Sequence, residues 1–67
     1  MQIQLNGEKQ TVPPHLKTVD DLIKHFKLNS KILVVEHNRH VLTREMHATT
    51  RLSDGDCIEI VHFVGGG

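Results

Sequence analysis

Residues 18–28, TVDDLIKHFKL, predict a helix around which the rest of the chain must be arranged. Thr18 is a favourable N-cap residue, and Asp21 stands where a carboxylate can bond back to the cap. Asn29 is a plausible left-handed stop, so we expect the helix over 19–28. Its apolar residues fall at offsets 0, 3, 4 and 7 of one helical face: Val19, Leu22, Ile23 and Phe26. Such a stripe needs a sheet to cover it.

The residues before the helix predict a β-hairpin. Apolar and polar side chains alternate over 1–6, and Asn6-Gly7 is a typical turn because both residues tolerate positive φ. A strict two-residue loop would place Glu8 on the buried face of the return strand, 8–12, so we expect a bulged or longer loop. Pro13-Pro14 cannot donate ladder hydrogen bonds and should end that strand at a sheet edge.

The residues after the helix predict three more strands. The expected strands are 32–35, which is rich in β-branched residues and suits a strand central in the sheet or buried on both faces, the short 41–43, and the long apolar 57–64. Turns are expected at 37–40 and 53–56, with an irregular connection over 44–50. The element order favours the α+β class and the β-grasp (ubiquitin-like) fold: a mixed sheet of four to five strands with one main helix packed across one face.

Length and charge exclude several classes of protein. A chain of 67 residues makes one small domain, too small for a substrate pocket enclosed on all sides. Eight basic and eight acidic residues give no net charge, which argues against binding to nucleic acid or an anionic membrane through the overall field. Cys57 is the single cysteine, and no signal peptide or long apolar run is present. We therefore expect a cytoplasmic protein.

Three glycines, Gly65, Gly66 and Gly67, follow the last predicted strand. They should form a flexible tail that could carry a terminal carboxylate into a channel too narrow for any Cβ. A carboxylate is inert until it is activated, for example by transfer of AMP from ATP. The alternative is a frayed end or a cloning remnant, since glycine-rich termini are commonly disordered.

Residues 52–67, LSDGDCIEIVHFVGGG, closely resemble the end of the ThiS family, the sulfur carriers of thiamin biosynthesis. The segment Glu36-His37-Asn38, followed by Val41 and Arg44, is similar to the middle of that family. The resemblance implies a carrier rather than an enzyme. It also implies that the chain needs no proteolytic maturation, because it already ends at Gly67.

The same resemblance implies a reaction at Gly67. An E1-like adenylyltransferase (ThiF-like) would adenylate it with ATP and magnesium, so that the carrier itself binds no cofactor. A sulfur relay from a cysteine desulfurase would convert it to a thiocarboxylate, which supplies sulfur to thiazole synthase (ThiG-like). Gly65 and Gly66 would form the tail threaded into these enzymes.

The last strand predicts a docking surface. Ile58 and Ile60 suit the side facing the helix, which leaves Val61 and Phe63 exposed on the other face, close to the tail. We expect Val61, Phe63 and Val64 to contact partner enzymes. The alternative for Phe63 is that it folds over the sheet edge as part of the core.

Other reactive side chains do not form a site in the sequence. His37 and His40 beside Glu36 lack a third ligand at fixed geometry, so we expect no metal site. Cys57 and His62 should lie on opposite faces of a strand, too far apart for a nucleophile and its base. No residue is therefore expected to be catalytic.

Three other functions stay open on this pattern. The chain could carry sulfur for another pathway, as the small subunit of molybdopterin synthase does. It could be a ubiquitin-like protein modifier, with the activated carboxyl captured by a lysine. It could also be a structural β-grasp module whose tail has no reaction.

Overall fold

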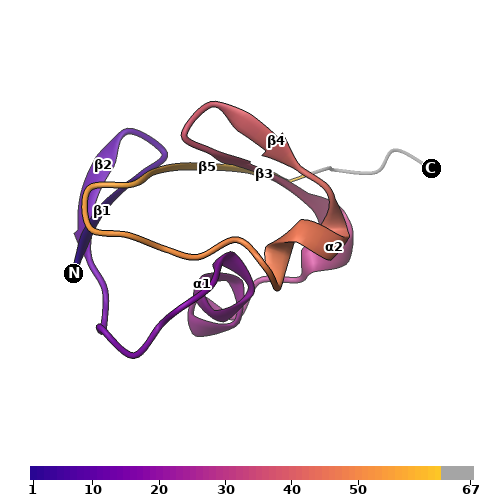
Figure 1. Ribbon diagram of the computed structural model, residues 1–67. Coiled ribbons are helices and arrows are strands. Elements are labelled where there is room, and N and C mark those ends of the chain that lie inside the picture. Colours follow the sequence, from indigo (N-terminus) through magenta and orange to yellow (C-terminus); the bar gives the residue numbers. More distant parts are fainter. Residues whose placement is uncertain (63–67) are drawn as a thin grey trace.

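The computed structural model describes residues 1–62 as a five-stranded mixed sheet with one helix across one face (Figure 1). The strand order is β2-β1-β5-β3-β4, in which β1 and β5 are parallel and every other neighbouring pair is antiparallel. The elements are β1 (Gln2–Leu5), β2 (Glu8–Thr11), α1 (Val19–His25), the 3-10 helix η1 (Ser30–Ile32), β3 (Leu33–His37), β4 (His40–Leu42), α2 (Arg44–His47) and β5 (Cys57–His62). The predicted β-grasp fold is confirmed.

The core lies between α1 and the sheet. Val19 and Leu22 of α1 are completely buried, as are Val35 of β3 and Ile58 of β5. Other buried apolar side chains complete this core: Ile3, Val12, Leu16, Ile23, Leu33 and Ile60. The predicted apolar stripe of the helix therefore packs on the sheet as expected, and Phe26 is only partly buried at its end.

The first hairpin has a strict two-residue turn, so the expected bulge or longer loop is wrong. Leu5 pairs directly with Glu8, and Asn6 and Gly7 have φ of 50° and 83°, which match the right-handed twist of the strands. Glu8 is nevertheless exposed, because β2 is the edge strand and lies beyond the part of the sheet that α1 covers (Figure 1). The edge position predicted from Pro13-Pro14 is confirmed.

Helix α1 begins as predicted and ends earlier. Thr18 and Asp21 form a capping box: the Asp21 amide donates to Thr18 Oγ1 at 3.2 Å, and the Thr18 amide donates to Asp21 Oδ2 at 3.2 Å. The left-handed residue that stops the helix is Lys27, with φ 58°, and not Asn29. The next amide, of Leu28, bonds back to the Ile23 carbonyl at 3.0 Å, and the Leu28 side chain packs against the core. This long-range packing favours the earlier stop.

Two predictions for the central segment need correction. Ile32 lies in η1 and is 46% exposed, and Val34 in β3 is half-buried, so 32–35 is not a strand buried on both faces. The alternative, a strand central in the sheet, is confirmed for β3, which lies between β5 and β4. Residues Arg44–His47, expected within an irregular connection, form α2. Four residues are too few to show a helical period in sequence, and α2 is fixed instead by burial of its last side chain, His47.

The remaining turns and the last strand agree with the sequence. Asn38 and Arg39 have positive φ in the turn between β3 and β4, and Gly55 has φ 87° in the turn before β5. Strand β5 begins at Cys57 as expected and is described to His62, so Phe63, Val64 and the predicted glycine tail, 65–67, lie outside the described residues. No helix in the part of the chain that the structure describes is long and apolar enough to cross a membrane.

Candidate functional site

Strand β5 leads to the predicted tail and is held on both sides. Ile58 and Ile60 face the helix and are buried, as predicted. The Asn6 side chain accepts a hydrogen bond from the Ile60 amide at 2.7 Å, and the Asn6 amide donates to the Ile58 carbonyl at 2.9 Å. On the other side β5 pairs with β3 from His37↔Ile58 to Leu33↔His62. The strand is therefore fixed along its whole described length, in the middle of the sheet.

The face of the sheet opposite α1 carries an apolar surface. Val61 is 56% exposed on this face, which confirms its predicted orientation. Its partner across the strands is the half-buried Val34, and Val41 of β4 lies diagonal to Val34 and is 66% exposed. We call Val34, Val41 and Val61 the valine patch. Sequence reasoning found Val61 alone, because the register that adds Val34 and Val41 depends on how three strands pair.

Two glutamates lie beside the valine patch on the face of the sheet opposite α1, which we call the open face. Glu36 and Glu59 are directly opposite each other in the β3–β5 ladder. They lie on the same face as Val34 and Val61, two residues away along each strand. Glu59 is exposed and Glu36 is half-buried. Neither carboxylate was singled out for a role from the sequence. Their pairing is a property of the register alone.

The residues considered as metal ligands have another role. His37 Nε2 lies 2.8 Å from Asp56 Oδ2, and Asp56 also accepts hydrogen bonds from the Ser53 amide at 2.8 Å and Asn38 Nδ2 at 3.2 Å. Burial raises the pKa of Asp56, but these hydrogen bonds outweigh it and hold the pKa below its ordinary value. His40 is exposed. Across residues 1–62, no three His, Cys, Asp or Glu side chains are grouped so as to hold a metal ion.

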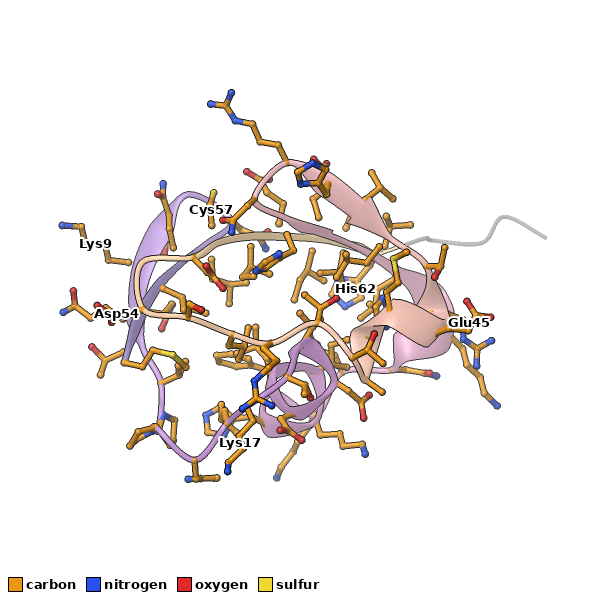
Figure 2. All side chains as sticks on the ribbon, in the orientation of Figure 1. Lys9, Lys17, Glu45, Asp54, Cys57 and His62 are labelled. Atoms are coloured by element: carbon orange, nitrogen blue, oxygen red, sulfur yellow. The ribbon has the colours of Figure 1, made fainter. Side chains whose placement is uncertain are left out.

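Cys57 and His62 lie at opposite ends of β5 (Figure 2). Cys57 follows the face of Glu59 and Val61, whereas His62 follows the face of Ile58 and Ile60. The predicted separation of this thiol from the imidazole is therefore confirmed, and the pair cannot act as nucleophile and base.

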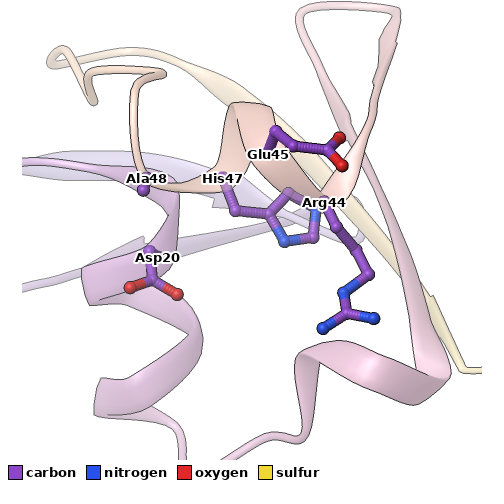
Figure 3. Close-up of a pocket in the computed structure, with 5 residues that line it drawn as sticks. All are labelled: Asp20, Arg44, Glu45, His47 and Ala48. Atoms are coloured by element: carbon purple, nitrogen blue, oxygen red, sulfur yellow. The ribbon is translucent and has the colours of Figure 1, made fainter.

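A pocket of about 460 Å³ lies between α1 and α2 (Figure 3). It is lined by Asp20, Arg44, Glu45, His47 and Ala48. His47 is 3% exposed, and neither ring nitrogen has a hydrogen-bond partner among the described residues. Burial lowers its pKa, which favours the neutral form of the imidazole. The burial of this histidine was not expected from sequence.

The predicted reactive residues themselves are not described. Gly65, Gly66 and Gly67, together with the docking residues Phe63 and Val64, lie outside residues 1–62, and their roles stay predictions. The described part of the site is the fixed strand that precedes them and the open face beside it.

The model of the ThiS family matches residues 2–67, which is nearly the entire chain. This chain belongs to the ThiS family. The match includes the turn at 53–56, strand β5 and the three terminal glycines on which the resemblance was first based.

Individual family members agree with this assignment. The sulfur carrier protein ThiS of Bacillus subtilis (strain 168) is 42% identical over 65 residues, covering 97% of this chain and 98% of that protein. A crystal structure of the thiamine biosynthesis protein ThiS from Geobacter metallireducens superposes with a TM-score of 0.85 at 35% identity, with both chains covered completely. Family membership and fold are thus supported independently.

A third relative has a different architecture. The thiazole synthase of Paramagnetospirillum magneticum (strain ATCC 700264 / AMB-1) is 33% identical over 67 residues, which is all of this chain but only 20% of that protein. A segment similar to this whole domain therefore occurs within a much longer thiazole synthase.

Proposed function

We propose that this chain is the sulfur carrier of thiamin biosynthesis, with the terminal carboxyl of Gly67 as the atom group that carries sulfur. The observation that supports this most strongly is the match of the ThiS family model over residues 2–67, glycines included. The 42% identity to the sulfur carrier of Bacillus subtilis over nearly the full length of both chains supports the same function.

The chemistry needs activation of the carboxylate. A carboxylate oxygen of Gly67 attacks the α-phosphorus of ATP, forming an acyl-adenylate and releasing pyrophosphate. A persulfide sulfur then attacks the glycyl carbonyl carbon and AMP leaves with the electron pair of the C–O bond. Reduction of the resulting acyl disulfide by a thiol of the relay gives the thiocarboxylate. Glycine suits both steps because no Cβ obstructs the approach to its carbonyl.

The carrier provides the reacting group and its partners provide catalysis. ATP and magnesium would be bound by an E1-like adenylyltransferase, and sulfur would come from a cysteine desulfurase relay. The chain is thus a substrate and not an enzyme. These reactions and the single free thiol, Cys57, favour the cytoplasm as its compartment.

The open face of the sheet would position the tail in these enzymes. Val61 is exposed at the end of β5 from which the tail continues, and we propose that Val61, Phe63 and Val64 dock on the partners. The ThiS-like segment within a long thiazole synthase supports thiazole synthase as one of them, since fusion keeps two partners at a high effective concentration.

Mass spectrometry tests the proposal directly. The chain is incubated with ATP, magnesium, its cognate adenylyltransferase and a sulfur source, and the C-terminal fragment is analysed. Conversion of carboxylate to thiocarboxylate adds about 16 Da, which oxidation of Met1 or Met46 would imitate, so the shift must map to a fragment containing Gly67.

The matched control is the chain without residues 65–67, which no longer ends in a glycine carboxyl and should show no shift in its C-terminal fragment. An unmodified Gly67 in the presence of an adenylyltransferase that is active on another carrier would contradict the proposal. Adducts with lysine-bearing proteins would favour a protein modifier instead.

A further inference from the structure

Glu36 and Glu59 are a like-charged pair on the open face of the isolated chain. They are directly opposite in the antiparallel β3–β5 ladder, where like charges repel and destabilise the sheet. The ion pairs within residues 1–62 join Lys24 to Asp20 and His37 to Asp56, so neither glutamate has a cationic partner there. A repulsive pair at the centre of an open sheet face needs a reason other than folding.

The valine patch surrounds this pair on two sides. Val34 and Val61 are the next cross-strand pair on the same face, and Val41 lies directly opposite Glu36 on β4. A protein that covers the exposed Val41 and Val61 must therefore also remove water from the two carboxylates. Burial of a carboxylate without a partner is strongly unfavourable, because the charge loses its hydration. A cationic side chain on the covering surface would offset this cost at that point.

We propose that the open face, valine patch and carboxylate pair together, docks a thiazole synthase through an apolar surface that places one arginine or lysine between Glu36 and Glu59. This inference rests on the proposed function. Thiazole synthase is favoured as the occupant because a segment similar to this whole chain occurs within one such protein. A guanidinium or ammonium between the two carboxylates would turn the repulsion of the free chain into two attractive contacts.

The alternative occupants differ in chemistry. A second copy of this chain could offer Lys9, which pairs with Gln4 on β1, next to Cys57 on β5. The adenylyltransferase, which we also expect to contact Val61, could be the enzyme that binds the carboxylate pair. Both are outcomes that the experiment must distinguish.

The variants are Glu36→Gln, Glu59→Gln and the double variant, which keep the side-chain size and remove the charge. Glu8→Gln is the matched control, because Glu8 is an exposed glutamate on the edge strand β2. It pairs with Leu5, and both residues follow the face of the sheet opposite to that of Glu36 and Glu59. All four are compared with the unchanged chain.

The first measurement is urea unfolding of the free chain. Relief of repulsion should raise the midpoint by about 0.2 to 0.5 M for each single variant at the open face. Glu8→Gln should leave it unchanged. A lower midpoint for Glu36→Gln or Glu59→Gln would mean that the carboxylates stabilise the fold, and would overturn the proposal.

The second measurement is the Kd for the cognate thiazole synthase, by calorimetry. We expect a roughly 10-fold weaker Kd for each single variant and about 100-fold for the double variant, with a smaller dependence on salt concentration. Glu8→Gln should bind normally. A stabilised chain that binds worse is a combination that a structural role cannot produce.

Three results would overturn the inference. They are an unchanged Kd for thiazole synthase, weakened binding of the adenylyltransferase alone, and loss of self-association as the only effect. Thiocarboxylate formation at Gly67 separates this failure from that of the proposed function: if Gly67 accepts sulfur and the variants bind normally, the carrier function stands and the docking inference fails.

Discussion

His37 at the end of β3 and Asp56, the residue before β5, are joined by a hydrogen bond of 2.8 Å between Nε2 and Oδ2, although they are nineteen residues apart. Asn38, the next residue, donates to the same carboxylate and accepts from the Cys57 amide at 2.9 Å. The β3–β4 hairpin is thereby attached to the turn that starts β5. The strand that precedes the predicted tail is fixed at its beginning by this contact.

Removal of the Asp56 carboxylate should destabilise the whole domain. Asp56→Ala deletes three hydrogen bonds, and we expect a loss of about 2 to 4 kcal/mol in the free energy of unfolding, measured by denaturant titration. His37→Ala should cost less, and His40→Ala, at an exposed position in the same hairpin, should be close to neutral. Equal effects of His37→Ala and His40→Ala would contradict this role.

The lowered pKa of Asp56 predicts how the stability of the domain changes in strong acid. Burial raises its pKa, but the hydrogen bonds from His37, Ser53 and Asn38 lower it by more than burial raises it. The pKa in the folded chain therefore lies below the 3.8 of an ordinary aspartate. The unfolded chain therefore binds the proton first, and the stability that the ionised carboxylate contributes is present above pH 3.8 and lost as pH falls through the folded pKa. Unfolding curves between pH 5 and pH 2 should show this loss, and Asp56→Asn should reduce it.

The lowered pKa of His47 predicts a separate loss of stability at mildly acidic pH. Burial lowers its pKa below the ordinary 6.5, with Asp20 opposing and Arg44 reinforcing the shift. Below pH 6.5 the unfolded chain binds the proton more readily than the folded chain, so stability decreases from there down to the folded pKa. His47→Leu should remove this decrease and stabilise the domain by about 1 kcal/mol, because two unpaired ring nitrogens leave the interior.

The control for His47 is His15→Leu, at an exposed position, which should keep the pH dependence of the unchanged chain. Thermal unfolding from pH 7.5 to 5 provides the measurement. If the curves of His47→Leu and the unchanged chain stay parallel throughout, the neutral buried imidazole is not responsible.

The two faces of β5 should respond differently to substitution. Val61→Asp changes an exposed side chain, so folding should be nearly unaffected while the KM for adenylation rises about 10-fold or more. Ile60→Ala, one residue earlier and buried, should cost about 2 to 4 kcal/mol of stability. Phe63→Ala should behave as Val61→Asp does. Unfolding of Phe63→Ala would indicate a core role for that side chain.

The first hairpin depends on the backbone of Gly7. Its φ of 83° lies in the left-handed region, and no atom lies within 4 Å of an added Cβ, so Gly7→Ala introduces backbone strain alone. We expect a loss of about 1 kcal/mol in thermal or chemical unfolding. Gly7→Asn should recover part of it, since asparagine tolerates positive φ. Indifference of stability to both changes would mean that the turn is not part of the folding unit.

Much of the functional site is determined by local sequence. The three glycines and the residues before them point to a reactive tail, and alternation along β5 assigns Val61 to the open face and Ile60 to the core. A strand has a period of two whatever its neighbours are, so its faces can be assigned before its partners are known. The valine patch and the paired carboxylates could not be predicted, because they exist only in the register of β5 with β3 and β4.

The sequence by itself determined where α1 starts, where the chain turns and which family it joins. A capping box acts over three residues and an Asn-Gly turn over two, so distant contacts are not needed to form either. Tertiary structure decided the early end of α1, where Leu28 packs on the core, the burial of His47, and the meeting of Glu36 with Glu59. Each of these depends on surfaces brought together from distant parts of the chain, and their free energy exists only once the sheet has formed.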